Sequence, residues 1–278
     1  MTLRRLISGA IYMLSGAIGV LAFIYPFFVP ASSQSSGVYA RTQDAPLLTA
    51  ALVGLSVVAL LIELQGQAIN AKTMAMLGIM VAVTSALRFL EVAFPMPGGF
   101  SPIFAPIIIS GYVFGGRFGY LMGTFTLLTS GLITGGVGPW LPYQMFTAGW
   151  AGLTAGWLRK VPALGDRSSQ SHQNPGLGPW RLGVLAVFGF IWGLLYGVIV
   201  NVYFWPFAAG PVAQSWAPGI GLGETLSRYA LFYAVTSLTW DLLRGAGNVL
   251  LILLLGAPMV KTLTRFRRRF AFEVNSYA

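Results

Sequence analysis

Apolar runs separated by short polar breaks make up most of this chain. Several runs reach the length of about 20 helical residues that crosses a hydrocarbon core. They lack the two-residue alternation of hydrophobicity that is typical of membrane β-strands. The pattern predicts eight membrane-spanning helices, over residues 6–29, 46–64, 73–93, 103–114, 118–134, 141–158, 182–204 and 229–260.

Proline and glycine mark the breaks between these runs. Residues 95–99 read Pro-Met-Pro-Gly-Gly, and residues 135–139 read Gly-Gly-Val-Gly-Pro. Proline has no N–H to donate and glycine favours irregular backbone, so both segments are predicted loops. The longest polar connector, residues 159–181, is a third. The first apolar run is too long for a signal-peptide core, so we expect a retained helix.

Composition supports a membrane protein. Hydrophobic residues make up 56% of the chain and charged residues only 9%. A soluble domain carries about 25% charged residues because its surface faces water. We therefore expect an all-α fold, a polytopic membrane helical bundle of about eight transmembrane helices.

The positions of the cations predict the orientation of this bundle. The eight spans place thirteen of the 17 Lys and Arg residues on one side: Arg4, Arg5, Lys72, Arg117, Arg159, Lys160, Arg167, Arg181, Lys261, Arg265, Arg267, Arg268 and Arg269. Only Arg41 and Arg228 fall on the other side. Positive charge marks cytoplasmic loops, so we expect a multi-pass plasma-membrane protein with both termini in the cytoplasm. This bias also accounts for the net charge of +10 without nucleic-acid binding.

The chain has no cysteine and a single histidine, His172, in a polar loop. Disulfides, iron–sulfur clusters and thiolate zinc sites are therefore excluded. We expect no metal and no cofactor.

Small residues spaced four apart form several ladders, which allow helices to approach closely in lipid. The ladders are Gly78, Ala82 and Ala86; Gly119 and Gly123; Ala148, Gly152 and Gly156; and Gly189, Gly193 and Gly197. Such a ladder either packs helices within the bundle or forms a docking face for a partner membrane protein. The sequence leaves both interpretations open.

Charged groups at membrane depth are costly and are usually functional. Arg88 and Glu91 share one helix face near the outer end of the third span. Asp241, Arg244 and Asn248 share a face of the last span, roughly 18–30 Å from its outer end at 1.5 Å per residue. We expect this second cluster to be deeper, and structural or coupling-related. Each pair could equally be an internal salt bridge that pins two helices.

Aromatic, amide and charged residues gather at the predicted outer mouth of the bundle. The candidate substrate-binding residues are Arg88, Glu91, Trp140, Tyr143, Gln144, Asn201, Tyr203, Trp205, Arg228, Tyr229 and Tyr233. Apolar walls with a few fixed polar groups are typical of a small-molecule pocket. An aromatic belt at the membrane interface is the alternative. A belt does not require Gln144 or Asn201, which favours the pocket.

Five segments together carry a resemblance to a known family. They are Gly78-x-x-x-Ala82-x-x-x-Ala86, Gly-Phe-Ser-Pro-Ile-Phe at 99–104, Gly-Tyr-Val-Phe-Gly-Gly-Arg-Phe-Gly at 111–119, Gly-Gly-Val-Gly-Pro-Trp-Leu-Pro-Tyr-Gln-Met at 135–145, and Trp240-Asp241-Leu242-Leu243-Arg244-x-x-x-Asn248. Through these, residues 73–269 resemble the substrate-specific (S) components of energy-coupling factor (ECF) vitamin transporters.

The resemblance implies a six-helix core, here residues 71–278, preceded by two additional helices in residues 1–70. It implies a vitamin-type ligand bound near the outer surface, a transmembrane scaffold (T) subunit and two cytoplasmic ATPase subunits. The face formed by Gly78, Ala82 and Ala86 would contact the scaffold, and residues 91–102 would gate the pocket. The segment 138–144 looks most like members that bind cobalamin or related cofactor precursors.

Two other classes of function remain possible from the residues alone. An intramembrane enzyme would need a nucleophile, a metal cluster or paired carboxylates. A channel or stand-alone secondary transporter would favour internal repeats and acidic groups at the membrane midplane, where Asp241 is the one candidate. The chain has no Gly-x-x-x-x-Gly-Lys phosphate loop, so we expect a non-catalytic subunit whose partners hydrolyse ATP.

Overall fold

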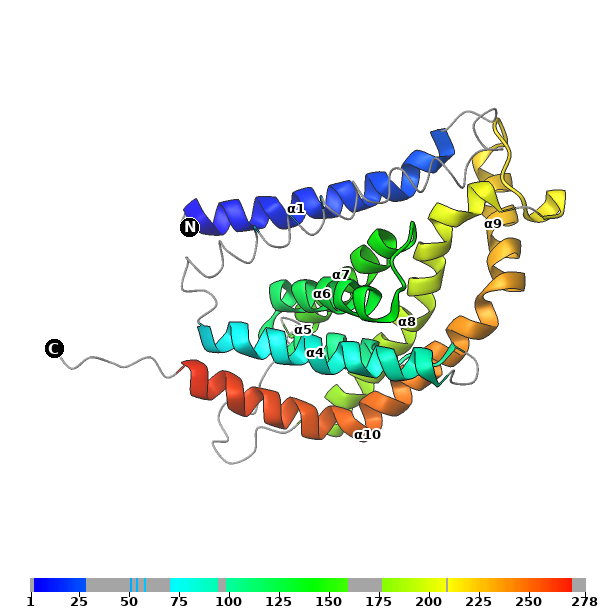
Figure 1. The fold of residues 1–278 in the computed structure, drawn as a ribbon. Coiled ribbons are helices and arrows are strands. Elements are labelled where there is room, and N and C mark those ends of the chain that lie inside the picture. Colours follow the sequence, from blue (N-terminus) through cyan, green and yellow to red (C-terminus); the bar gives the residue numbers. More distant parts are fainter. Residues whose placement is uncertain are drawn as a thin grey trace.

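The computed structural model describes residues 3–28, 51, 54, 58, 71–94, 99–159, 177–208 and 210–271. These residues form eight α-helices and no strand (Figure 1). The helices are α1 (Leu3–Ile24), α4 (Ala71–Ala93), α5 (Phe104–Phe114), α6 (Gly116–Thr134), α7 (Leu141–Leu158), α8 (Pro179–Phe204), α9 (Leu222–Thr236) and α10 (Leu238–Ala271). Short 3-10 helices follow α1 (η1, Tyr25–Phe28) and α8 (η4, Trp205–Phe207), and a third (η5, Val212–Gln214) precedes α9.

The predicted helix bounds agree closely with the structure over the central helices. Helix α7 has the predicted bounds, and α4, α5, α6 and α8 match theirs to within three residues. Four helices of the described ranges are long and apolar enough to cross a membrane: Gly9–Phe28, Lys72–Ala93, Pro179–Phe207 and Leu238–Arg267. The helical membrane bundle is therefore confirmed. The second predicted span, 46–64, lies outside the described residues apart from three isolated positions.

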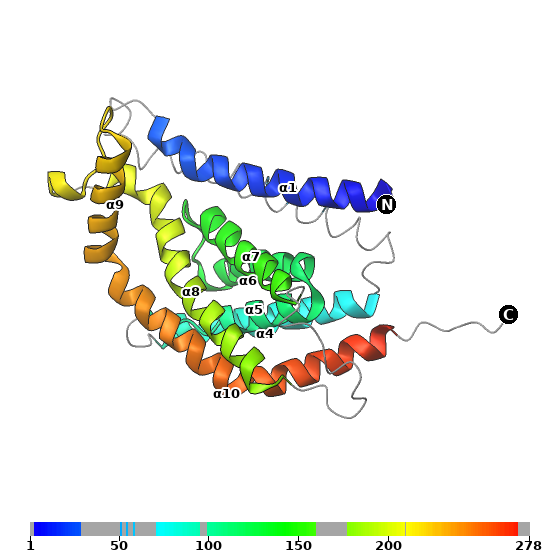
Figure 2. The same cartoon turned by 180° about the vertical axis from the view of Figure 1, so that it is seen from behind.

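The last predicted span, 229–260, is wrong as a single helix. The chain breaks at Ser237, so α9 and α10 are separate helices that meet at a bend (Figure 2). The Thr236 hydroxyl donates to the Phe232 carbonyl at 2.7 Å, and such back-bonding often bends helices. Asn201 on α8 donates to the Ser237 hydroxyl at 2.6 Å and so holds the bend. The prediction and the structure each give eight helices, but the two sets differ. The predicted span 229–260 is divided between α9 and α10, and the predicted span 46–64 lies outside the helices described.

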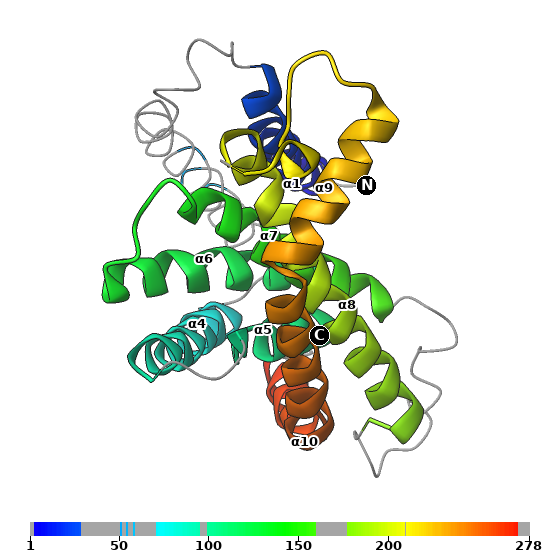
Figure 3. The same cartoon turned by 90° about the vertical axis from the view of Figure 1, so that its right-hand side faces the viewer.

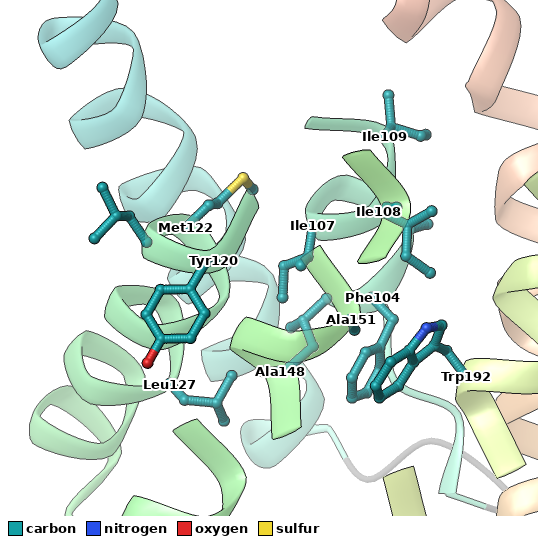
Figure 4. Close-up of a cluster of buried hydrophobic side chains, with 14 of the residues drawn as sticks. Phe104, Ile107, Ile108, Ile109, Tyr120, Met122, Leu127, Ala148, Ala151 and Trp192 are labelled. Carbon is teal, nitrogen blue, oxygen red and sulfur yellow. The ribbon is translucent and has the colours of Figure 1, made fainter. Parts of the chain in front are cut away.

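Helix α5 has only 11 residues and lies inside the bundle. All of its residues from Phe104 to Val113 are buried, and it contacts α6, α7, α8 and α10. Figure 3 shows it among these helices, and Figure 4 shows side chains from α5, α6, α7 and α8 filling one interior cluster. Since other helices enclose it, α5 need not span the lipid by itself.

The helices alternate in direction, which gives the bundle two chemically different ends. Helices α1, α4 and α6 begin, and α5, α7 and α10 end, at what we name the basic end, on the left of Figure 1; α8 begins at the bottom of that view. Two arginines, Arg159 and Arg267, donate to the Val113 carbonyl there, at 3.3 and 2.6 Å. The opposite end, where α4 and α8 end, is named the mixed-charge end.

Helix α1 packs on the side of the bundle opposite α4 (Figures 1 and 3). Ser15 and Tyr120 share a hydrogen bond between the α1 and α6 side chains. The Phe23 and Tyr143 rings lie 5.0 Å apart, which joins α1 to α7. Gly19 lets the two helices approach, because a Cβ atom there would lie 2.8 Å from the Phe146 ring. Helix α1 therefore contacts α6 and α7 at Ser15, Gly19 and Phe23.

Candidate functional site

The structure separates the small-residue ladders into internal and external ones. A Cβ atom at Gly152 on α7 would lie 2.1 Å from the Gly119 carbonyl oxygen on α6. On α8, a Cβ atom at Gly193 would lie 2.4 Å from the Gly245 Cα atom of α10. These ladders hold the bundle together, as expected for helix packing in lipid.

The α4 ladder is different because it faces outward. Gly78, Ala82 and Ala86 are all exposed, and a Cβ atom at Gly78 would meet nothing within 4 Å. Large apolar neighbours on this face, Ile79 and Val83, are 58% and 53% exposed. The opposite face of α4 packs on α6. The ladder predicted to dock a partner therefore has no partner within the described chain.

At the mixed-charge end, Arg88 and Glu91 form the ion pair that their spacing predicts. The Arg88 Nη1 and Glu91 Oε1 atoms lie 2.7 Å apart. The Ser101 hydroxyl donates to the other Glu91 carboxylate oxygen at 2.8 Å. Ser101 belongs to the segment that leads into α5, so Glu91 ties the end of α4 to that segment.

The second predicted cluster is also an ion pair, and it is more buried. Arg244 donates to the Asp241 carboxylate, whose residue is only 2% exposed. The Arg244 guanidinium also lies 5.0 Å from the centre of the Tyr196 ring, within the range of a cation–π contact. Gly197 makes room for this arrangement, because a Cβ atom there would overlap the Asp241 carboxylate.

The second pair is not deeper than the first by a long stretch of helix, contrary to the expectation. Asp241 lies in the first turn of α10, and α10 contacts α4, which carries Arg88 and Glu91. The prediction counted residues along one straight helix from Tyr229. Because the chain bends at Ser237, Asp241 instead lies in the first turn of α10, at the mixed-charge end.

The segment before α5 closes the gap between the two pairs. A Cβ atom at Gly99 would lie 3.3 Å from the Trp240 carbonyl oxygen. One at Gly247 would lie 2.4 Å from the Phe100 ring. This part of the predicted gate, residues 91–102, therefore packs against α10; residues 95–98 lie outside the described residues.

Three predicted site residues line one cavity at the mixed-charge end. The cavity holds about 160 Å³ and lies between the end of α4, the end of α6 and the start of α7. Arg88, Trp140 and Gln144 contribute to its wall, together with Ser130 and Thr134. Trp140 is 44% exposed, and its indole N–H donates to the Gly136 carbonyl at 3.1 Å. The cavity thus combines a cation, an amide, hydroxyls and an aromatic ring.

The predicted aromatic residues form a separate, buried group. The Tyr143 and Tyr203 rings stack with centres 4.0 Å apart, and the Trp205 and Tyr229 rings meet edge to face at 5.0 Å. Tyr143, Tyr203 and Trp205 are at most 6% exposed. The aromatic-lined mouth expected from the sequence is therefore closed in this structure.

The remaining predicted residues make contacts within the protein. Arg228 donates to the Ser215 carbonyl at 3.0 Å and pairs with Glu224 at 2.5 Å, which holds the preceding loop on α9. Tyr233 lies on α9, and its hydroxyl is buried. Asn248, fully buried, donates to the Gly189 carbonyl at 2.9 Å and joins α10 to α8.

Several residues of this end were missed by reasoning from the sequence. Tyr196 lies inside a long apolar run. Its hydroxyl was the feature that could have marked it as a site residue. Ser101 had no distinguishing pattern. Phe23 of α1 and Phe27 of η1 cover Tyr143 and Trp205, and nothing in their spacing indicated these distant neighbours.

A comparison with protein families identifies the molecule. The model of the family "ECF transporter, substrate-specific component" matches residues 72–256, well over half of the chain. The chain belongs to this family. Neither a curated protein nor a solved structure matches it.

The family match accounts for much of what the structure contains. S components are helical membrane proteins and the substrate-binding, non-catalytic subunits of ECF transporters. The matched segment includes the cavity at the mixed-charge end, both ion pairs and the outward ladder of α4. Helix α1 precedes the match, so this S component carries a packed helix in addition to the matched region.

Proposed function

We propose that this S component captures a small vitamin-type molecule at its mixed-charge end and delivers it together with a T scaffold subunit and two ATPase subunits. The mixed-charge end would face the cell exterior and the basic end the cytoplasm. The observation that carries this proposal is the cavity that unites Arg88, Trp140 and Gln144. Convergent polar groups in an otherwise apolar wall are what a small-molecule site requires.

The charges at the mixed-charge end favour a ligand without large net charge. Each acidic side chain that the structure describes pairs with an arginine: Glu91 with Arg88, Glu224 with Arg228, and Asp241 with Arg244. Positive and negative groups at this end therefore balance. A neutral or zwitterionic molecule that forms several hydrogen bonds fits this balance best.

The size of the cavity bears on the first candidate ligand. A volume of about 160 Å³ is below the roughly 300–1,000 Å³ of pockets for drug-sized ligands. A cobalamin-like compound, suggested by the resemblance of segment 138–144, would require the stacked Tyr143 and Tyr203 to separate. We therefore favour a smaller vitamin or precursor, with cobalamin as a comparison ligand.

Docking to the scaffold would use the outward ladder of α4. Gly78, Ala82 and Ala86 present little side chain, so a partner helix could approach the α4 backbone closely. Helix α1 packs on the other side of the bundle and does not cover this face, and neither does any other described helix (Figure 1). An S component with this additional helix could therefore still bind its scaffold in the expected way.

Ligand capture is tested by extracting and identifying the small molecule that co-purifies with the full chain, using mass spectrometry after growth in varied media. Gln144→Ala should then weaken binding of the recovered molecule by about 1–3 kcal/mol, because a buried hydrogen bond is lost. Gln214→Ala removes an amide at the same end but outside the cavity and should leave affinity unchanged. Recovery of no molecule, or equal losses in both variants, would contradict the assigned site.

Orientation can be tested because the natural chain has no cysteine. Val137→Cys introduces a thiol at the mixed-charge end, where Val137 is 57% exposed, and Lys72→Cys places one at the basic end. A membrane-impermeant maleimide should label intact cells only at position 137. Labelling of position 72 alone would put the cavity on the cytoplasmic side and would rule out uptake from outside.

A further inference from the structure

A series of hydrogen bonds leads from the segment before α5 to the wall of the cavity at the mixed-charge end. The Ser101 hydroxyl donates to one Glu91 carboxylate oxygen at 2.8 Å. The other Glu91 oxygen lies 2.7 Å from the Arg88 Nη1 atom. Among the described residues, Arg88 lines the cavity, whereas Glu91 and Ser101 do not. The last two residues therefore contact the cavity wall from behind.

Ser101 lies in a short segment that is packed on both sides. The residue is only 2% exposed. Before it, Gly99 has φ +72°, a backbone conformation that favours glycine, and the Phe100 ring packs beside Gly247 of α10. After it, Ile103 is buried and leads into the buried helix α5. The position of the Ser101 hydroxyl is therefore set by α5 and α10, and not by α4.

The end of α4, which carries the other two residues of the series, is less enclosed. Leu90 and Val92 are 50% and 51% exposed, and the side chains of Arg88 and Glu91 are partly exposed. A long side chain that is free to change rotamer loses entropy when a ligand fixes it. The bond from Ser101 restrains the Glu91 carboxylate, and that carboxylate in turn restrains the Arg88 guanidinium.

We propose that Ser101 is a positioning residue for substrate capture, which acts through Glu91 to hold the Arg88 guanidinium at the cavity wall. A guanidinium has five N–H donors in one plane, and the ion pair engages the Nη1 group. Donors outside the pair can then meet an acceptor of the small molecule, such as a carbonyl or carboxylate oxygen. Restraint before binding lowers the entropic cost of binding. This inference rests on the capture site proposed above.

Phenylglyoxal, a small reagent that modifies arginine, measures how firmly Arg88 is held without any bound ligand. The purified full chain is treated with the reagent, and peptide mass spectrometry follows the rate of modification at each arginine. Ser101→Ala should speed modification of Arg88 roughly threefold or more, because Glu91 then holds the guanidinium less firmly. The rate at Arg228, which pairs with Glu224, should stay unchanged. An unchanged rate at Arg88 would overturn the proposal.

A matched variant separates positioning from the general effect of removing a buried hydroxyl. Ser110 of α5 is fully buried, and its hydroxyl has no hydrogen-bond partner among the described residues. Ser110→Ala should therefore leave the rate at Arg88 unchanged. If it speeds modification of Arg88 as much as Ser101→Ala does, the effect of Ser101 is one of packing and the proposal is wrong.

Combined variants test whether Ser101 acts through Glu91. Glu91→Ala should speed modification of Arg88 at least as much as Ser101→Ala, because it removes the paired carboxylate itself. In the Glu91→Ala background, Ser101→Ala should add no further change, since the series is already broken. A further change of the same size would show that Ser101 acts by another route and would overturn the proposal.

The outcome for Arg88 is separate from the outcome of the capture test. If no small molecule is recovered from the full chain, the proposed capture function fails while the rates at Arg88 still stand. If a molecule is recovered, Ser101→Ala should bind it roughly threefold or more weakly, and Ser110→Ala should bind it normally. Equal binding by these two variants would refute the positioning role alone.

Discussion

Helices α4 and α7 each carry three small residues spaced four apart, and the bundle uses the two sets in opposite ways. On α7, Gly152 lies against the α6 backbone, where a Cβ atom would be 2.1 Å from a carbonyl oxygen. On α4, the position of Gly78 is open, with nothing within 4 Å of an added Cβ atom. The same spacing thus builds the core in one helix and, in the other, leaves an apolar face that no described helix covers.

This difference shows what small-residue spacing does and does not specify. It specifies that a helix can be approached closely. It does not specify whether the approaching helix belongs to the same chain. That depends on neighbours far away in the sequence, such as Gly119 for α7. A ladder that remains uncovered after the chain has folded is therefore the better candidate for a docking face.

The largest expected effect comes from the same substitution in both ladders. Gly152→Leu should destabilise the protein by more than about 4 kcal/mol, because the new side chain must displace backbone rather than a flexible side chain. Gly78→Leu should change stability by less than about 0.5 kcal/mol. Thermal unfolding in detergent measures both. Similar losses in the two variants would mean that the α4 face is covered.

A third ladder, on α8, makes room for the buried Asp241 carboxylate. Breaking its ion pair with Arg244 should have the next largest effect on stability. Arg244→Ala leaves the Asp241 carboxylate, in a residue only 2% exposed, without its cation and should cost about 3–5 kcal/mol. Asp241→Asn in the same chain should recover part of this loss. Glu224→Ala breaks an exposed pair of the same end and should cost at most about 1 kcal/mol. If Arg244→Ala and Glu224→Ala lower the free energy of unfolding by the same amount, Asp241 is exposed to water in the folded protein.

The outward ladder should matter for assembly and not for folding. Ala86→Leu should weaken binding of the T scaffold subunit by roughly tenfold to hundredfold, because the added side chain keeps the two helices apart. Ala230→Leu adds the same side chain to an exposed position of α9 and should bind normally. Quantitative co-purification compares the two. A parallel loss of small-molecule binding in Ala86→Leu would contradict a separate docking face.

The sequence predicted the local features of this S component well. The bounds of α7 and the two ion pairs followed from hydrophobic runs and from i, i+3 spacing, which depend on nearby residues alone. The bend at Ser237 did not follow, because a hydrogen bond from Asn201 on another helix holds it. For the same reason the packing of Phe100 beside Gly247 of α10, and the covering of Tyr143 by Phe23, required the folded structure.

The smallest expected effect concerns the buried face of α4, where neighbouring hydroxyls differ in their partners. Ser85 donates to the Thr126 carbonyl of α6 at 3.2 Å, so Ser85→Ala should cost about 0.6 kcal/mol, the average for such bonds in membrane proteins. The Thr84 hydroxyl is buried and has no hydrogen-bond partner among the described residues. Thr84→Val keeps the shape, removes an unsatisfied polar group, and should be neutral or slightly stabilising. If Thr84→Val instead costs more than Ser85→Ala, the Thr84 hydroxyl has a hydrogen-bond partner in the folded protein.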